Sequence, residues 1–120
     1  MFALSSATRV FLLPGVTDMR KGFEGLRSLA EHRLNQDPLS GHLFVFCNRH
    51  CNRLKVLFWD GTGLWVCAKR LEGGRLDWPR EGEAMKDYTI QQLTLLLDGI
   101  VLKQAVEKKW YRRRPGDEKK

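Results

Sequence analysis

The sequence has few cysteines, no long apolar run and no recognisable signal peptide, and each of these shortages argues against a class of protein. Three cysteines in 120 residues are an odd number, so the disulfide framework of a small secreted domain is not expected. No apolar run approaches the roughly 18–20 residues that a membrane-spanning helix needs, and no basic and then apolar leader is visible at the first residues. We therefore expect a protein of the reducing cytoplasm that does not contact a membrane.

Catalytic motifs are also missing. The chain has neither a glycine-rich phosphate loop with its lysine nor a Gly-x-Ser-x-Gly elbow. A nuclease or transposase core would need two or three acids that converge on Mg²⁺. The pattern instead assigns Asp18 to a helix cap, Asp60 to a turn and Asp98 to a helix end, and only Asp77 is left unexplained. We therefore expect no enzymatic activity and no cofactor, with a nuclease subunit as a minor alternative.

Positive charge, in contrast, is abundant. The net charge is +7 and the isoelectric point is about 9.7, in a chain that is 42% hydrophobic and 29% charged. This composition is that of one globular domain with its own core. A charge excess of this size favours polyanionic partners, chiefly nucleic acid.

The first third of the chain predicts a short strand and a helix. Arg9–Leu13 has the pattern of a buried strand closed by a proline–glycine pair. Thr17 or Asp18 would then cap a helix that runs to Leu34, because a short oxygen-bearing side chain satisfies free N–H groups of the first turn. The apolar stripe of this helix consists of Met19, Phe23, Leu26, Ala30 and Leu34.

The middle of the chain predicts successive antiparallel strands. The Asp60-Gly61 pair is a strong turn signal between two of them. The strands are His42–Cys47, Arg53–Asp60 and Leu64–Arg70, with a short edge strand at Arg75–Pro79. In the second strand, one face carries Leu54, Val56 and Phe58, and the other carries Lys55, Leu57 and Trp59.

The last third predicts a polar loop at residues 80–88 and a second helix. Thr89 and Gln92 have the spacing of a capping box, and Gly99 is placed to end the helix after Asp98. We expect both helices to cover one sheet face and the positive charge to lie on the other face or on a rim. The predicted fold is thus α+β, an antiparallel β-meander of four to five strands packed with two helices. Residues 1–102 would form a single globular domain and residues 103–120 a basic C-terminal tail.

The segment "NRHCNRLK" (Asn48–Lys55) is the most unusual stretch, because it gathers cations, amides, a histidine and a cysteine at a hairpin tip. Zinc prefers four Cys or His ligands delivered in close pairs. Cys47 and Cys51 supply one such pair, with His50 beside them, but no second close pair exists. Neighbours on an extended chain point in opposite directions, which also disfavours a catalytic His50–Cys51 dyad. We therefore expect no metal at this tip.

Two readings of the tip stay open. Its cations would reach phosphates from one hairpin, and Asn48 and Asn52 would position a nucleic-acid backbone or base edges. Alternatively, the asparagines fill turn positions and the arginines only solvate the tip. A second cationic cluster, Lys108–Arg114, favours the functional reading, because its arginines suit phosphates. Trp110 within it would either stack on bases or pack on the sheet.

Four segments carry a family resemblance. They are "TDMRKGFEGL" (Thr17–Leu26), "GHLFVFCNR" (Gly41–Arg49), "RLKVLFWDGTGLWVCAKRLE" (Arg53–Glu72) and the Trp78-Pro79 pair. Together they closely resemble the small accessory protein, called TnpB or Orf2-like, of the insertion-sequence-66 family of bacterial transposable elements. The resemblance implies an accessory that supports transposition beside a separate transposase, which carries the catalytic acids. It transfers no binding or catalytic residue. The motif residues that it makes candidates are Asp18, Arg20, Lys21, Trp59, Asp60, Lys69 and Arg70.

We therefore predict a non-enzymatic accessory protein for transposition that binds element DNA through its cationic clusters. The expected partners are DNA and the transposase of the same element, and a homodimer is a further option. The alternative is a protein–protein adaptor that docks on the transposase or dimerises, with Trp59, Trp65 and Trp78 as anchors. The predicted nucleic-acid contacts are Arg20, Lys21, Arg49, Arg53, Lys55, Lys69, Arg70, Lys108, Lys109, Arg112, Arg113 and Arg114.

Overall fold

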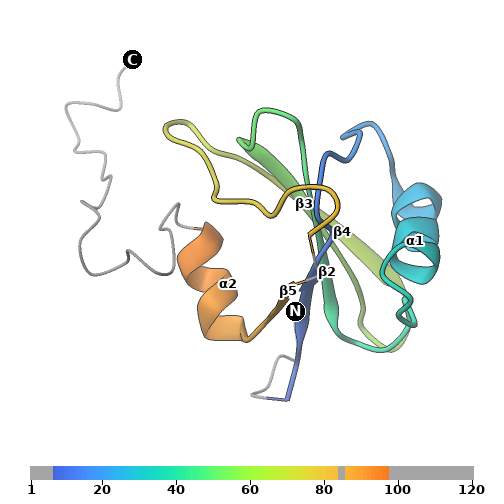
Figure 1. Ribbon diagram of the computed structural model, residues 1–120. Coiled ribbons are helices and arrows are strands. Elements are labelled where there is room, and N and C mark those ends of the chain that lie inside the picture. Colours follow the sequence, from blue (N-terminus) through green and yellow to red (C-terminus); the bar gives the residue numbers. More distant parts are fainter. Residues whose placement is uncertain (1–6, 84–85, 98–120) are drawn as a thin grey trace.

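A five-stranded sheet between two helices forms the protein, as the computed structural model in Figure 1 shows. The structure describes residues 7–83 and 86–97. The elements in chain order are β1 (Val10–Leu12), α1 (Phe23–His32), β2 (Leu43–Cys47), β3 (Arg53–Trp59), β4 (Leu64–Arg70), β5 (Lys86–Tyr88) and α2 (Ile90–Leu97). The α+β class is confirmed, and the predicted tail 103–120 lies outside the described residues.

The sheet is mixed rather than purely antiparallel, which corrects the predicted meander. Its strand order is β4-β3-β2-β1-β5. Strands β2, β3 and β4 form the expected antiparallel series, but β1 runs parallel to β2, with Val10 beside Leu43. A strand followed by a crossover helix returns to the sheet in its original direction, so the β1–α1–β2 unit pairs in parallel. On its other side, β1 pairs antiparallel with β5.

The two helices lie on opposite faces of the sheet, where the prediction had placed both on one face (Figure 1). Helix α1 buries Leu26 in a core cluster that includes Leu57 of β3, and this side is called the α1 face. Helix α2 adds Leu93 to a second cluster that includes Leu54 of β3, on the α2 face. The alternation along β3 was predicted correctly and is what feeds both clusters. The positive charge therefore has no bare sheet face to occupy and must lie at edges and rims.

Helix α1 begins later than predicted, at Phe23 rather than near Thr17. The Asp18 carboxylate accepts hydrogen bonds from the backbone and side chain of Arg20, so it forms a tight turn before the helix and caps nothing. The N-cap is Gly22, which has no side-chain cap. Phe23, expected in the buried stripe, is 52% exposed, because the helix face turns inward only at Leu26.

The capping box of α2 is confirmed. The backbone N–H of Gln92 donates to Thr89 Oγ1 at 3.2 Å, and the backbone N–H of Thr89 donates to Gln92 Oε1 at 2.8 Å. The proposed end of this helix at Asp98 and Gly99 falls outside the described residues.

The predicted edge strand at Arg75–Pro79 is not a strand. This segment crosses the end of the sheet on the α2 face, where the Leu76 N–H donates to the Cys51 carbonyl at 2.7 Å. The indole N–H of Trp78 donates to the Leu13 carbonyl at 2.9 Å. The sheet edge is instead formed by β5, within residues 80–88 that the sequence marks as a loop. Only three residues pair there, too few to show a strand pattern.

Candidate nucleic-acid interface

The asparagines of the hairpin tip hold the tip together. Asn48 Oδ1 accepts from the backbone N–H groups of Asn52 and Arg53, both at 3.0 Å, and Asn48 Nδ2 donates to Asn52 Oδ1 at 2.8 Å. Cys51 takes the left-handed conformation at φ 56°. Both amides are thus committed to the turn, which leaves the cations of the tip as its contact groups.

The cysteines and histidines of the tip do not assemble as ligands. Cys47 is fully buried, and burial, followed by the neighbouring Cys51, raises the pKa of its thiol to about 12. His42 Nδ1 accepts from the backbone N–H of Arg9 at 3.0 Å. Across residues 7–83 and 86–97, no group of three or more His, Cys, Asp or Glu side chains is placed to hold a metal ion.

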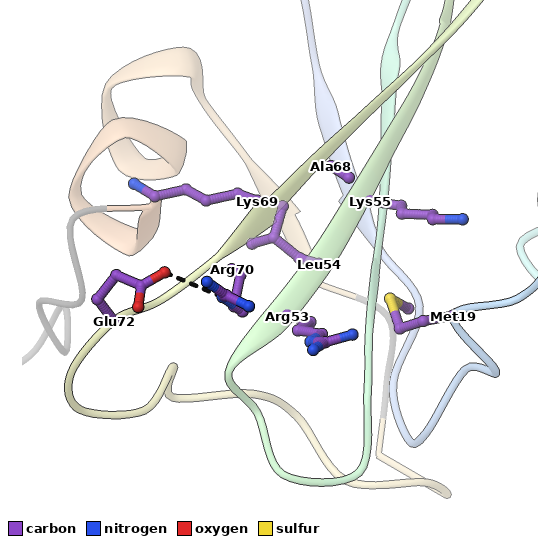
Figure 2. A pocket seen from close by; sticks show the side chains of 8 residues that line it. All are labelled: Met19, Arg53, Leu54, Lys55, Ala68, Lys69, Arg70 and Glu72. Carbon is purple, nitrogen blue, oxygen red and sulfur yellow. Dashed lines mark hydrogen bonds and ion pairs between the residues drawn. The ribbon is translucent and has the colours of Figure 1, made fainter.

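Basic side chains gather where β3 begins and β4 ends. They line an open hollow of about 490 Å³, here called the cationic hollow (Figure 2). Its lining residues are Met19, Arg53, Leu54, Lys55, Ala68, Lys69, Arg70 and Glu72. Four of the predicted contact residues, Arg53, Lys55, Lys69 and Arg70, therefore share one depression, with Glu72 as its single lining acid.

Arg53 and Arg70 lie directly opposite each other on the two strands. The Leu71 N–H donates to the Asn52 carbonyl at 2.7 Å, which marks Asn52 and Leu71 as a hydrogen-bonded pair. One position further along, Arg53 and Arg70 form a non-hydrogen-bonded pair, the type in which Cα atoms and side chains come closest. Two guanidinium groups are thus held side by side on the α1 face, and like charges in this position disfavour the fold.

Lys55 and Lys69 extend from the strands in different directions (Figure 2). Lys55 is two residues from Arg53 on the same strand and so shares its face. Its Nζ donates to the Lys21 carbonyl at 2.9 Å, which fixes the ammonium beside the loop that precedes α1. Lys69 is opposite Leu54 and projects to the α2 face. Of the two lysines, Lys55 is therefore the one that joins the arginine pair.

Arg49 and Arg53 line a second hollow, between the hairpin tip and residues 16–19. No ion pair among the described residues involves either of these arginines. We call the continuous set formed by Arg49, Arg53, Lys55 and Arg70 the cationic surface.

Two acids partly neutralise the rim of this surface. Asp18 holds the Arg20 guanidinium at 2.8 Å, and that hydrogen bond lowers the pKa of Asp18 and raises the pKa of Arg20. Glu72 holds Arg70 Nε at 2.9 Å. Sequence reasoning missed both pairings, although a spacing of two residues between acid and arginine signals them. Arg20 is therefore a weaker candidate than its exposure suggests, whereas the tail candidates Lys108–Arg114 lie outside the described residues.

Of the three tryptophans proposed as anchors, Trp65 is the exposed one, at 39%. Its indole N–H donates to Asp60 Oδ2 at 2.7 Å, and its ring stacks on Phe58 with centroids 6.2 Å apart. Trp59 is half-buried, and the hydrogen bond of Trp78 to Leu13 ties that side chain to the core. Among the described residues, no helix is long and apolar enough to cross a bilayer.

Comparison with known proteins places the chain in a family. Residues 8–107 match the family model described as IS66 Orf2 like protein. The chain is 44% identical over 93 residues to the uncharacterized protein y4hO of Sinorhizobium fredii, which covers 77% of this chain and 80% of that protein. It is 31% identical over 100 residues to the uncharacterized protein y4jC of the same organism, which covers 83% and 86%. No solved structure matches. The chain belongs to the family of IS66 Orf2-like proteins, and its role is an accessory one associated with the transposition of an insertion sequence.

Proposed function

We propose that this accessory protein binds element DNA without acting as an enzyme, and that the cationic surface of Arg49, Arg53, Lys55 and Arg70 grips the phosphate backbone. The observation that carries the proposal is the direct cross-strand pairing of Arg53 with Arg70. A pair of like charges on adjacent strands costs stability and offers the fold nothing in return. A phosphate between the two guanidinium groups would convert that repulsion into charge-assisted hydrogen bonds.

The surroundings of this pair support the same proposal. Lys55 is held beside Lys21 by a hydrogen bond that uses its ammonium as donor, so the charge is positioned rather than free to sweep. Arg49 extends the surface across the hairpin tip. The net charge of +7 adds a long-range attraction to any polyanion. Contacts of this kind position a protein on DNA and do not by themselves read its sequence.

Salt dependence of DNA binding tests the proposal. Fluorescence anisotropy would follow the purified protein on duplex DNA from an element end, and on unrelated duplex, over a series of salt concentrations. Each neutralised phosphate contributes about −0.9 to the slope of log affinity against log salt. Arg53→Gln and Arg70→Gln should each flatten the slope by about one contact and weaken binding to both duplexes.

Arg33→Gln is the matched control, because it removes one positive charge at the far end of α1. That end is about 15 Å along the ten-residue helix from the loop beside the cationic surface. The control should keep the wild-type slope. The proposal is wrong if wild-type protein does not bind duplex DNA at low salt, or if Arg33→Gln lowers the slope as much as the two test variants.

The adaptor hypothesis rests on a different observation, the exposed ring of Trp65 on the outermost strand. Docking on the transposase through this ring would show little dependence on salt and a marked loss in Trp65→Ala. A pull-down of purified transposase at low and high salt, with wild type and Trp65→Ala, separates this function from DNA binding.

A further inference from the structure

Strand β4 presents an open hydrogen-bonding edge. It is terminal in the sheet, and among the described residues no strand pairs with its outer side. All seven of its residues are in register with β3, without a bulge, and none is proline. Natural proteins usually shorten, bend or cover such an edge because it templates pairing with another chain. The edge of β4 is instead long and regular, and this calls for a partner strand.

The hydrogen bonds at both ends of β4 fix which of its backbone groups point outward. Asp60 pairs with Gly63 at one end and Asn52 with Leu71 at the other. Because the pairing alternates along an antiparallel ladder, Trp65, Cys67 and Lys69 must direct their N–H and C=O groups to β3. The outward groups are those of Leu64, Val66, Ala68 and Arg70.

We propose that β4 pairs with β4 of a second copy of this chain, antiparallel and centred on Cys67. In a symmetric pair, only this register uses all four outward residues, with Leu64 opposite Arg70 of the partner copy and Val66 opposite its Ala68. The two Cys67 residues then face each other at the centre, as a non-hydrogen-bonded pair. In such pairs the Cα atoms are about 4.5 Å apart, within the range that a disulfide spans.

The side chains of β4 complement each other in this register. Trp65 of one copy faces Lys69 of the other on the α2 face. Since one face of the Trp65 ring stacks on Phe58 of β3, its other face is turned to the open edge, where the partner's ammonium would lie. The Asp60 carboxylate bound to the Trp65 indole adds a negative charge at the same place, and hydrogen bonds from Thr62, Trp65 and Gly63 keep the pKa of Asp60 low. The two ends of β4 thus carry opposite charge and match when the strands are antiparallel.

The pairing would also place the two cationic surfaces on one side. A twofold axis through Cys67 and perpendicular to the sheet keeps the α1 face of each copy on the same side of a ten-stranded sheet. Arg70 lies on β4 itself, so each cationic surface borders the new interface. The inference does not depend on DNA binding, because the hydrogen-bonding edge and the charge match belong to the protein alone.

Light scattering after size-exclusion chromatography and oxidative cross-linking test this pairing. The full chain should elute at twice its mass of 13.9 kDa. Copper–phenanthroline should oxidise the two Cys67 thiols to an intermolecular disulfide, with the electrons passing to the oxidant. Cys67→Ser should abolish this cross-linked dimer on a non-reducing gel, whereas Cys51→Ser, the matched control, should retain it.

Ala68→Pro tests the backbone pairing separately, because the proline removes an outward N–H and spares the ladder with β3. It should give a monomer whose melting transition persists, while Ala68→Ser, which keeps the N–H, should remain dimeric. Ala68→Pro leaves the positive charge intact, so its DNA-binding slope per chain tests the proposed function independently. A monomer at every protein concentration, or a dimer that forms in Ala68→Pro and cross-links through another cysteine, would overturn the inference.

Discussion

The substitution Arg53→Thr should make the protein more stable and a weaker binder of DNA. The reason is the like-charged pair with Arg70, in which two guanidinium groups are held at a position of close cross-strand approach. Threonine removes one charge and suits a strand, since a β-branched side chain packs well on a pleated surface. A residue kept for the fold would show the opposite pattern, with a loss of stability and no effect on binding.

The size of the gain follows from the exposure of the pair. Cross-strand pairs contribute roughly 0.2–1 kcal/mol, and like charges are unfavourable by similar amounts. The Arg70 side chain is 60% exposed and is bound to Glu72, so solvent and the acid both reduce the repulsion. We expect a gain of about 0.2–0.5 kcal/mol from relieved repulsion, which raises the melting temperature by about 1–2 °C for a chain of this length.

Thermal unfolding at low and high salt measures this effect. The gain should shrink as salt rises, because the screening length falls from about 8 Å at 0.15 M to about 3 Å at 1 M. Arg70→Thr should stabilise the fold to a similar extent, and the double variant should gain less than the sum, since either change removes the same repulsion. If Arg53→Thr lowers the melting temperature and leaves DNA affinity unchanged, the reasoning on the arginine pair is refuted.

Further predictions concern stability. Phe44→Ala should cost about 3–5 kcal/mol in the free energy of unfolding, because Phe44 is fully buried, whereas Phe23→Ala, at a side chain that is 52% exposed, should cost much less; urea titration of both variants compares them. Thr17→Val should leave stability unchanged or raise it by about 1 kcal/mol, because Thr17 Oγ1 is buried and finds no hydrogen-bond partner among the described residues, and Thr17→Ser should not give this gain. Asp60→Asn should be less stable than wild type at neutral pH, because four hydrogen bonds to the Asp60 carboxylate lower its pKa in the folded state. A group with a lowered folded pKa stabilises above its unfolded pKa of about 3.9, so the difference should shrink in urea titrations as pH falls below about 4; a difference that stays constant with pH would contradict this origin.

The local patterns of the sequence were reliable where one principle acts alone. The alternation along β3 placed Leu54 and Leu57 on opposite faces, and both contribute to the clusters that the alternation implies. The Thr89–Gln92 box marked the start of α2 correctly, because a capping box is a reciprocal contact between residues three apart. Asp60 formed the predicted turn.

The errors arose where distant segments decide the structure. The place of β1 between β2 and β5 depends on residues that are far apart in the chain, and no local pattern reveals it. Arg20 illustrates the same limit in the candidate site. Its charge looked available in the sequence, but a neighbouring carboxylate takes it up. The pairing of Arg53 with Arg70 required the strand register, which the sequence leaves undetermined.

The central place of β1 has a consequence for how the chain folds. Strands β2, β3 and β4 are consecutive and close short loops, so they are expected to assemble early. Strand β1 precedes them in the chain, yet it needs β2 across the α1 crossover and then β5, which pairs Val10 with Tyr88. During synthesis, β1 leaves the ribosome ahead of every other strand of the sheet and must wait with its apolar residues unpaired. The strand that is made first is therefore the one whose pairing is completed last.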